Sequence, residues 1–439
     1  MHCSVIGLGP AGTAAAAAAR RAGHSVDCWD PDGPQYPSTM GAWEHQIPQW
    51  LRDHPRPYLS CTQPRVCGDG WETTLSDTYV ILNPQALRDQ LPTDDDESLH
   101  MRRRHHDPHH DDADLIVDTT PPTSGFVPVK QLAVGLVLPE GVIPTEHRHA
   151  VLMDMRTLPP IRTPDHRHEF DGVTRMNPHS SSPSHRMTFN YRMPTGEDRW
   201  LIEETIVATT CRGSKTSPES EHSQLKYLEI SLRRRLVQLG IDPDTADRCA
   251  YHKEVVSFSL APRRRQWPHS TRRSTRAGVR FPWGASAGLM HAATGYSIGM
   301  ALSDANKEIE WAARWSQRPL ITRNLSGIRH GPPRGWLTGW LQRRGLAATL
   351  QFQPDEMRLF YRAFFALPQP NIRSYLTASR GCDVLRAMVG VVAWLVSFHT
   401  QTTRLRQTQP ETTRRYQRSL VHRTFLSLLR GSTARLPRR

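Results

Sequence analysis

Three kinds of pattern follow one another along the chain and indicate different elements. Near the N-terminus, an apolar run over residues 3–6 leads into an alanine-rich helical stretch and then a second apolar run that ends at Asp30. Between about residues 150 and 209, apolar and polar positions alternate as in strands with one buried face. Later in the chain, Trp336, Leu337, Trp340 and Leu341 recur at helical spacing. This order predicts an α/β protein whose middle part is rich in strands.

The turn after the first apolar run has the spacing of a dinucleotide-binding loop. In it, Gly7 permits a tight bend, Gly9 lets backbone N–H groups approach a pyrophosphate, and Gly12 lets the helix pack closely on the strand. The helix N-terminus then presents its positive dipole end to the anion. Asp30 stands where the second strand ends, so its carboxylate can accept hydrogen bonds from ribose hydroxyls. The segment therefore predicts dinucleotide binding.

A second glycine-rich turn lies far away in the sequence. The apolar run over residues 279–283 is followed by five candidate cofactor contacts, Gly284, Ala287, Gly288, Thr294 and Gly295, before a helical pattern begins. Two glycine turns at opposite ends of a chain are what a flavoprotein needs to hold FAD from both sides. A nicotinamide-only dehydrogenase does not require the second turn. We therefore expect the cofactor to be FAD.

Charge and composition limit the partners. The net charge of +14, from 56 basic and 42 acidic residues, suits lipid headgroups or nucleic acid. The sequence has no RNP motif, zinc-finger spacing or recognition-helix pattern, so we predict exposed basic loops and no nucleic-acid partner. The histidines at 105, 106, 109 and 110 fit no defined metal spacing, and a solvated loop is favoured over a metal site.

Cysteine usage and the N-terminus indicate the compartment. The seven cysteines are odd in number and form no C-x-x-C pair, which favours a reducing cytoplasm over a disulfide framework. The first strand begins at residue 2, so we expect no leader peptide.

The C-terminal region has features of a membrane-surface segment. Its longest apolar run, residues 385–398, contains Arg386 and is shorter than the ~18 residues of a spanning helix, which leaves a buried helix and an interfacial membrane helix as alternatives. Four large apolar residues recur nearby at helical spacing beside arginines: Trp336, Leu337, Trp340 and Leu341. Tryptophan flanked by arginine suits a membrane interface. We expect a peripheral protein on the inner face of the cell membrane, with anionic headgroups as its partner.

Six segments resemble, in order, motifs of the lycopene cyclases, the FAD-dependent carotenoid cyclases of bacteria and plants. They are the first glycine turn, YPSTMGAWEHQIPQW, KQLAVGLVL, LMDMR, LIEET and GASAGLMHAATGY. Residues 359–388 also resemble the C-terminal helices of the family. LIEET and HAATGY are distinctive, whereas many flavoproteins share the first turn. The chain departs from the family pattern at His45-Gln46, where the family has Asp-Glu.

The resemblance implies a domain plan. It comprises a Rossmann-type FAD-binding domain over residues 1–145 and 250–315, a sheet-built substrate domain over 146–249, and a helical, membrane-docking region over 316–439. The implied substrate is a lycopene-like carotenoid.

The resemblance also implies the reaction. A proton added at C2 of an acyclic end group leaves a cation at C1, the C5=C6 bond attacks it, and loss of the C6 proton gives a β-ionone ring. Such an isomerase has no net redox change. Reduced FAD would stabilise the developing cation, with NADPH or NADH as candidate reductants.

The implied proton donor is a glutamate of LIEET. An acid that protonates an alkene must be held neutral, and burial in an apolar pocket achieves this by raising its pKa. Glu203 and Glu204 are the candidates, and neighbouring residues of a strand face opposite ways, so only one can point into the pocket. The resemblance assigns the role to Glu203. The alternative is two ordinary strand-edge glutamates, one of them in a salt bridge.

Two other functions remain open. One is a different FAD-dependent oxidoreductase or hydroxylase acting on an apolar substrate, which flavin oxidation coupled to turnover would reveal. The other is a degenerate, non-catalytic flavin-binding paralogue, favoured by His45-Gln46 and testable by the absence of bound FAD.

Overall fold

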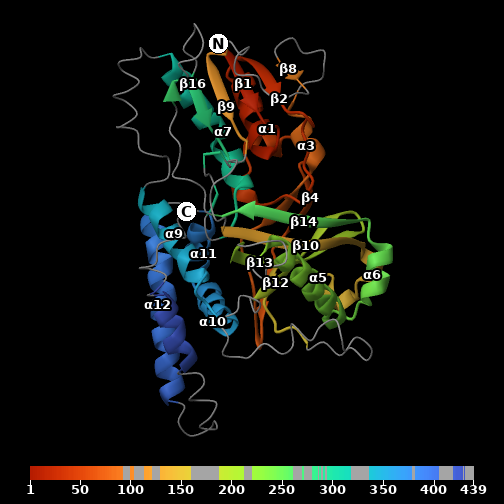
Figure 1. Ribbon diagram of the computed structural model, residues 1–439, viewed down its shortest axis with the longest axis vertical. Helices are drawn as coiled ribbons and strands as arrows, with labels where there is room; N and C mark the ends of the chain where they lie inside the picture. The colour runs from red at the N-terminus through yellow and green to blue at the C-terminus, as the bar shows by residue number, and fades with distance from the viewer. Residues whose placement is uncertain are drawn as a thin grey trace. The chain divides into compact units, whose positions relative to one another are not determined.

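The computed structural model divides into two units, each with its own sheet (Figure 1). Unit 1 comprises Met1–Thr62, Asp77–Gly125 and Ala261–Leu337, and unit 2 comprises Gln63–Ser76, Phe126–Leu260 and Thr338–Arg439. The residues that the structure describes within them are 1–91, 99–102, 113–120, 129–159, 187–211, 220–260, 269–270, 279–284, 286–287, 290–291, 294–317, 336–377, 381–404, 419–428 and 430.

The main sheet of unit 1 has the strand order β15-β16-β9-β1-β2-β8. All neighbours pair in parallel except β15 with β16. The strands are β1 (His2–Ile6), β2 (Ser25–Trp29), β8 (Leu99–Arg102), β9 (Leu115–Asp118), β15 (His269–Ser270) and β16 (Val279–Pro282). The chain runs from β1 to β2 on one side and returns to β9 on the other. The strand order therefore reverses beside β1, the position at which open parallel sheets bind ligands.

Two helices of unit 1 pack together beside this sheet. In α1 (Pro10–Arg21), the run of alanines from Ala14 to Ala19 is buried and contacts α7 (Ile298–Ser316), because short side chains permit close packing. A smaller antiparallel sheet has the order β3-β7-β4. Its strands and the short helices near them are β3 (Gly41–Trp43), β4 (Tyr58–Thr62), β7 (Tyr79–Leu82), η1 (Glu44–Gln46), α2 (Gln49–Arg52) and α3 (Pro84–Arg88).

The sheet of unit 2 has the order β14-β10-β13-β12-β11-β5-β6. It consists of β5 (Arg65–Gly68), β6 (Trp71–Thr74), β10 (Val129–Pro139), β11 (Val151–Asp154), β12 (Thr188–Gly196), β13 (Arg199–Thr210) and β14 (His252–Ser259). One face packs against α5 (Glu221–Gln238), whose Leu228, Leu232 and Leu236 share a hydrophobic core with alternate residues of β10 and β13. Around this sheet lie η2 (Glu140–Val142), η3 (Thr145–His147) and α6 (Pro243–Cys249).

The C-terminal part of unit 2 is helical. It contains α9 (Trp336–Thr349), α10 (Pro354–Phe365), α11 (Gln369–Leu376), α12 (Gly381–Arg404) and further helical residues at 419–428. Aromatic side chains join these helices, as in the edge-to-face pair of Phe364 and Tyr375 at 5.2 Å. A capping box of Gln353 and Glu356 starts α10.

The α/β fold class predicted from the sequence, a Rossmann-type domain with a second sheet and a helical C-terminal region, is confirmed. The division into three domains stays a prediction. Four strands of the unit 2 sheet, β5, β6, β10 and β14, lie outside the residues 146–249 expected to build the substrate domain. Only strand pairing connects them to this sheet, because they lie far from β12 and β13 in the sequence.

The structure also corrects the reading of the C-terminal apolar run. Residues 385–398 form part of the longer α12, and within the described residues the segment Gly381–Gln401 is long and apolar enough to cross a membrane, with 22% of it buried. The core helix of a soluble protein can pass the same test. The helix is longer than the apolar run because it also includes residues 381–384 and 399–404.

Candidate functional site

The first glycine turn closes the carboxyl end of β1 and starts α1. Gly7 has a φ of +85°, a left-handed conformation that glycine adopts without strain. A Cβ added to Gly12 would lie 1.8 Å from the carbonyl oxygen of Gly7, so only glycine lets the helix start this close to the turn. A Cβ on Gly9 would meet no atom of the described residues within 4 Å. The turn therefore leaves room for an anion beside the N-terminus of α1.

Asp30, immediately after β2, is hydrogen-bonded to the backbone of this turn. Its carboxylate accepts hydrogen bonds from the backbone N–H groups of Leu8 at 2.7 Å and Asp32 at 3.0 Å. Carboxylate oxygens have about four lone-pair sites in total, so acceptor capacity is left for hydroxyl groups. The predicted contact with a ribose stays a prediction.

The second glycine turn meets the first at the same edge of the sheet. Because β1, β9 and β16 are parallel neighbours, Gly7, Thr119 and Gly284 follow the ends of adjacent strands. Gly284 has a φ of +61°, and a Cβ on it would lie 2.6 Å from the Cβ of Ala11 in α1. Thr119 Oγ1 donates a hydrogen bond to the carbonyl of Gly7 at 2.9 Å. The two turns that sequence reasoning singled out thus lie against one another.

Among the described residues of this second turn, Thr294 carries an unsatisfied polar group. Gly295 has a φ of +76°, and its N–H donates to the carbonyl of His291 at 2.8 Å. Thr294 Oγ1 is buried without a hydrogen-bond partner among the described residues. Buried hydroxyls are normally satisfied, so a polar cofactor group would fit here. Ala287 is buried, and Gly288 lies outside the described residues.

An aromatic cluster brings two of the sequence motifs together in unit 1. The ring of Trp43 lies 5.1 Å from that of Tyr79, and Tyr296 lies 6.3 Å from each of them. A Cβ on Gly41 would lie 2.2 Å from the Tyr79 hydroxyl, so glycine makes room for that ring. Sequence reasoning missed Tyr79, which belongs to none of the matching segments. The departure at His45-Gln46 places the Gln46 amide against Gly299 of α7, where a Cβ would lie 2.4 Å from Gln46 Oε1.

In unit 2, Glu204 points to the face of the sheet that α5 covers. Its strand neighbours Ile202 and Ile206 lie in the core beneath α5, and Glu204 itself is fully buried. Glu204 Oε1 accepts a hydrogen bond from Arg235 Nε at 2.7 Å, and Arg235 is fully buried too. Burial raises the pKa of Glu204, while the charge of Arg235 opposes this. Glu204 therefore belongs to a buried ion pair that joins β13 to α5.

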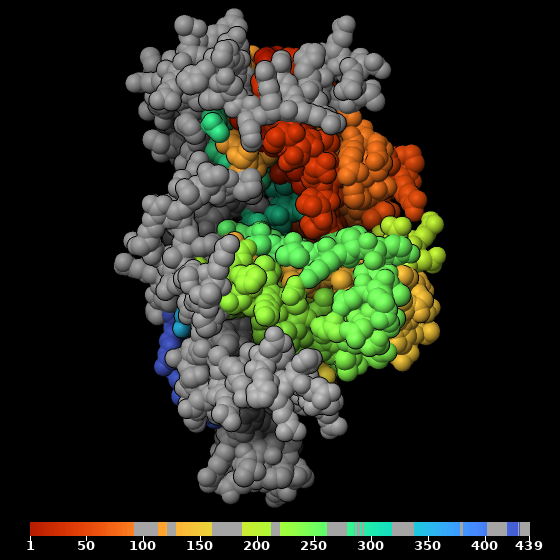
Figure 2. Space-filling view, turned by 45° about the vertical axis from the view of Figure 1, so that its right-hand side comes forward, coloured from red at the N-terminus to blue at the C-terminus, as the bar shows by residue number. Residues whose placement is uncertain are grey.

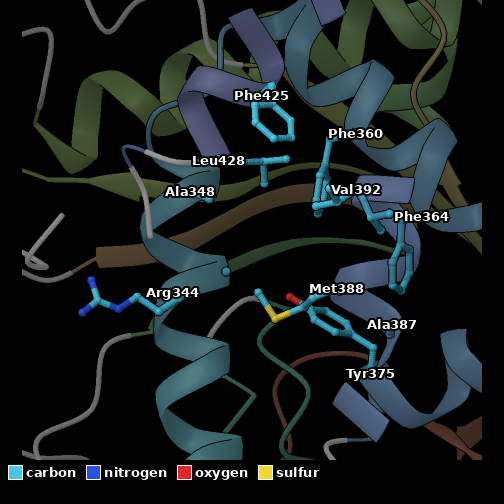
Figure 3. Close-up of a pocket in the computed structure, with 12 residues that line it drawn as sticks. Arg344, Ala348, Phe360, Phe364, Tyr375, Ala387, Met388, Val392, Phe425 and Leu428 are labelled. Atoms are coloured by element: carbon cyan, nitrogen blue, oxygen red, sulfur yellow. The ribbon is translucent and has the colours of Figure 1, made fainter. Parts of the chain in front are cut away.

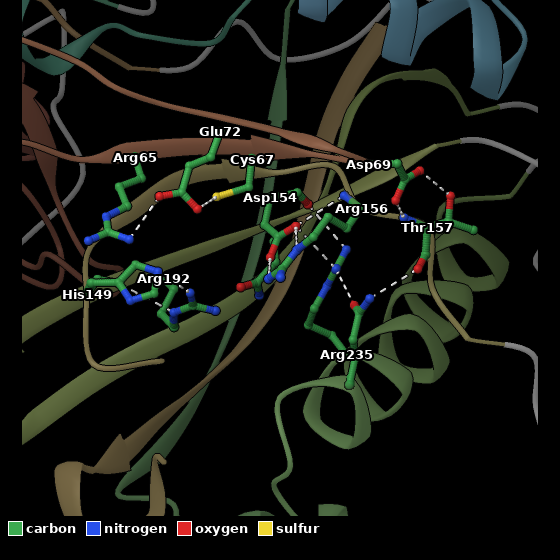
Figure 4. Close-up of polar contacts among 12 residues, drawn as sticks. Arg65, Cys67, Asp69, Glu72, His149, Asp154, Arg156, Thr157, Arg192 and Arg235 are labelled. Atoms are coloured by element: carbon green, nitrogen blue, oxygen red, sulfur yellow. Dashed lines mark hydrogen bonds and ion pairs between the residues drawn. The ribbon is translucent and has the colours of Figure 1, made fainter. Parts of the chain in front are cut away.

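Arg235 of this ion pair also belongs to a wider polar network with Asp154 and Arg156 (Figure 4). Arg235 Nη2 also donates to the carbonyl of Asp154 at 3.2 Å, and Nη1 lies 3.6 Å from Asp154 Oδ1. Burial alone would raise the pKa of Asp154, but hydrogen bonds and charge from Arg156 and Arg235 outweigh it and lower that pKa. The LMDMR segment thus supplies both Asp154 and Arg156 to this network of hydrogen bonds and ion pairs. Sequence reasoning matched that segment without finding this role.

Arg192 extends the network on the same side of β12. It is fully buried, and its Nη2 lies 3.4 Å from His149 Nε2. Burial lowers the pKa of Arg192 to about 10, and burial together with Arg192 lowers the pKa of His149 to about 4. A neutral imidazole nitrogen can accept a hydrogen bond from this guanidinium.

Glu203 points to the opposite face of the sheet. Its neighbours there are the side chains of Leu201, Met193, Phe189 and Val207, which are all buried. The carboxyl is half-buried, and its Oε1 accepts a hydrogen bond from Thr205 Oγ1 at 2.8 Å. Burial raises the pKa of Glu203 to about 7, despite the opposing effect of Thr205. A carboxylic acid in this position keeps its proton near neutral pH and can act as a general acid.

An apolar cavity of about 190 Å³ lies among the C-terminal helices (Figure 3). It is lined mainly by aromatic and aliphatic side chains, including Phe360, Phe364, Met388 and Val392. Val392 also belongs to an exposed stripe along α12. The expected membrane face of α9 is only partly present, because Trp340 is exposed but Leu341 is buried. The side chains of Trp336 and Leu337 lie outside the described residues.

Comparison with known proteins assigns the family. A family model described as lycopene cyclase protein matches residues 107–388, well over half of the chain. The chain belongs to the lycopene cyclase family. A Deinococcus radiodurans protein named an uncharacterized carotenoid cyclase is 26% identical over 420 residues, which is 89% of each chain. The family resemblance stated from the sequence motifs is confirmed.

Among solved structures, this lycopene cyclase family member is similar in fold to a reductase-like protein. A geranylgeranyl bacteriochlorophyll reductase-like protein from Thermoplasma acidophilum matches with a TM-score of 0.50 and 10% identity, covering 89% of this chain and 98% of that one. The flavin-dependent brominase Bmp2 matches with a TM-score of 0.46 and 13% identity, covering 92% of this chain and 100% of that one. At 10% identity, the similarity to the first of these proteins concerns the fold alone.

Proposed function

We propose that this protein is an FAD-dependent lycopene cyclase that converts an acyclic carotenoid end group into a β-ionone ring without net redox change. The observation that carries the proposal is the half-buried carboxyl of Glu203 on the apolar face of β13, with its pKa raised to about 7. Glu203 belongs to the distinctive LIEET segment of a chain in this family. Protonating an unactivated alkene requires an acid of this kind, neutral and poorly solvated.

The site residues described above then each have a part in the proposed reaction. Glu203 donates its proton to C2 of the end group, and the apolar neighbours on its face exclude water from the resulting cation. Glu204 anchors the strand through Arg235, which holds Glu203 on the opposite face. The glycine turns of unit 1 would hold FAD, with Gly9 leaving space for its pyrophosphate and the unsatisfied hydroxyl of Thr294 available to one of its polar groups. When bound in its reduced form, FAD supplies an electron-rich ring that stabilises positive charge.

A membrane surface is the proposed source of the substrate. Four exposed residues of α12 lie at helical spacing and form an apolar stripe: Leu385, Val389, Val392 and Val396. With the positive net charge, this stripe suits docking on the anionic inner face of the cell membrane. Val392 belongs both to the stripe and to the wall of the apolar cavity, so an apolar chain can pass from lipid to the cavity.

The cyclase proposal is tested by anaerobic turnover of lycopene with chemically reduced flavin, followed by chromatography of the pigments. We expect ring formation with no stoichiometric consumption of reductant, and no ring formation when the flavin is oxidised. One reductant equivalent consumed per product would instead establish an oxidoreductase. A protein that binds no FAD would establish the degenerate paralogue.

The variant Gly9→Val tests whether the first glycine turn binds the cofactor. Because a Cβ at Gly9 meets no described atom within 4 Å, the variant should fold normally but obstruct the approach of a pyrophosphate. We expect loss of bound FAD and of activity together. A flavin-loaded Gly9→Val protein would contradict the assignment of this turn.

The docking proposal is tested by sedimentation with vesicles containing anionic lipid. We expect Val389→Asp to weaken binding, whereas Val237→Asp, at an equally exposed valine on α5, should not. High salt should release only part of the wild-type protein, because it screens charge but not apolar burial. Equal binding by the two variants would exclude the α12 stripe as the docking face.

A further inference from the structure

A second carboxylate lies in the same row of the sheet as Glu203. Gly135 of β10 is the register partner of Glu203 on β13 and also of Glu254 on β14. Residues directly opposite one another on neighbouring strands project to the same face of a sheet. Glu203 and Glu254 therefore project to one face, with Gly135 between them. Neighbouring strands are about 4.8 Å apart, so the two backbones are separated by roughly 10 Å.

Gly135 leaves the middle of this row without a side chain. A Cβ there would lie 3.0 Å from the Cβ of Glu203 and 2.9 Å from Leu201 Cδ1, so those groups already occupy the space above the glycine. Glycine weakens a strand interior and marks a close approach. Here the close approach is between Gly135 and its register partner Glu203. The signal was present in KQLAVGLVL, where Gly135 interrupts a long apolar strand.

Glu254 is itself buried although β14 is the edge strand of the sheet and lies at the surface (Figure 2). Only 4% of its side chain is exposed, and its Oε1 lies 3.3 Å from Nε2 of the more exposed His252. Besides burial, the largest effect that raises the pKa of Glu203 is the charge of Glu254, ahead of that of the adjacent Glu204. The two carboxyl groups of the row thus interact electrostatically across Gly135.

Ring closure needs a proton acceptor as well as a donor. We propose that Glu254 is the base that removes the C6 proton of the end group, opposite the acid Glu203. This inference rests on the proposed cyclisation. It assigns the last step of that reaction, and with it the choice of ring, to a residue outside the matching sequence motifs. His252 is the positioning residue that orients the Glu254 carboxylate.

The steps balance in protons and electrons. The Glu203 O–H bond breaks as a C2–H bond forms, and the electron pair comes from the C1=C2 bond. The C5=C6 pair then forms the C1–C6 bond and leaves a cation at C5. Finally the C6–H pair becomes the new C5=C6 bond, and its proton goes to the Glu254 carboxylate. After the product leaves, that proton passes to Glu203, which restores both groups.

The position of the base decides which ring forms. The C5 cation gives a β ring on losing the C6 proton, an ε ring on losing one from C4, and a γ ring on losing one from the methyl group on C5. Removing the base beside C6 should therefore change the distribution of products as well as the rate. A residue with a purely structural role would change the rate alone.

The experiment compares the full-length, FAD-loaded wild type with Glu254→Gln, Glu254→Asp and Glu229→Gln. Glu229 of α5 is a matched control. It pairs with Lys253, the neighbour of Glu254 on β14, but its own side chain is about half exposed. We expect Glu254→Gln to lower β-ring formation by ~10²-fold and to enrich ε and γ rings in the remaining product. Glu254→Asp keeps a carboxylate and should restore part of the β-ring share. Glu229→Gln should behave as wild type.

Infrared titration of the Glu203 carboxyl gives a readout that is independent of turnover. Replacing Glu254 by glutamine removes a nearby negative charge, so the pKa of Glu203 should fall, with Glu203→Gln identifying its band. An unchanged titration would overturn the inference. So would Glu254→Gln with wild-type rate and products, or with a lower rate and unchanged ring composition. If the wild type forms no ring, both the proposed cyclase function and the base role of Glu254 fail. If the wild type is active and Glu254→Gln is unaffected, only the base role fails.

Discussion

The two faces of β13 give adjacent glutamates different partners. On the α5 side, Glu204 is fully buried and bonded to the guanidinium of Arg235 at 2.7 Å. On the other side, Glu203 has a hydroxyl partner, Thr205, and a carboxylate neighbour across Gly135. The first arrangement stabilises a charge, whereas the second keeps a proton on the acid. A shift of one residue along the strand therefore separates a structural ion pair from a candidate acid.

The largest expected effect is on the rate of cyclisation. Glu203→Gln keeps the size of the side chain and removes its acidic proton, so ring formation should fall by ~10²–10⁴-fold while the protein stays folded and flavin-loaded. Glu204→Gln should retain more activity, because that residue faces α5. Pigment analysis of both variants at equal flavin content tests the difference. If Glu204→Gln is the inactive one, the roles of the two faces are exchanged.

The next largest effect is on stability, where the Glu204 variant should be affected more than the Glu203 variant. Glu204→Leu leaves the buried Arg235 with Asp154 as its remaining charged neighbour, so we expect a loss of about 3 kcal/mol in the free energy of unfolding, at the low end for broken buried pairs. Glu203→Leu removes no ion pair and should cost much less. Urea denaturation measures both. The double variant Glu204→Leu/Arg235→Leu should recover part of the loss, and equal destabilisation by the two single variants would contradict the comparison.

A smaller effect is the pH dependence of stability. Folded Glu203 keeps its proton up to about pH 7, compared with an ordinary pKa of 4.5. Its contribution to stability is therefore fully present below pH 4.5 and is lost as the pH rises to about 7. Thermal unfolding of Glu203→Gln should accordingly show a gain over wild type that grows between those two values.

Asp154 on the other face supplies the control of opposite sign. Its folded pKa is lowered, so its contribution is present above its ordinary value of 3.8 and is lost as the pH falls through the folded value. Asp154→Asn should therefore be less stable than wild type, and this difference in stability should disappear only in acid. A pH-independent difference between Glu203→Gln and wild type would show that Glu203 titrates normally.

The sequence predicted the local features of these sites and missed their long-range partners. The tight bend at Gly7, and the opposite orientation of Glu203 and Glu204, follow from properties of single residues or of one strand. The pairing of Glu204 with Arg235 depends on how α5 packs on the sheet. The alignment of Glu254 with Glu203 depends on two strand registers, which no single segment encodes.

The smallest expected effect concerns the hydrogen bond between Thr205 Oγ1 and Glu203 Oε1 at 2.8 Å. This bond favours the ionised carboxylate and lowers the pKa of Glu203. Thr205→Val removes the donor, so the pKa should rise above its wild-type value and the fall of cyclisation rate with increasing pH should move to higher pH. A hydrogen bond is worth about 0.5–1.5 kcal/mol, which corresponds to a shift of about one pH unit or less. Thr188→Val, beside Glu204 on the opposite face, is the matched control and should leave the profile in place. A shift to lower pH in Thr205→Val, or equal shifts in both variants, would show that the acid of the reaction is not the carboxyl bonded to Thr205.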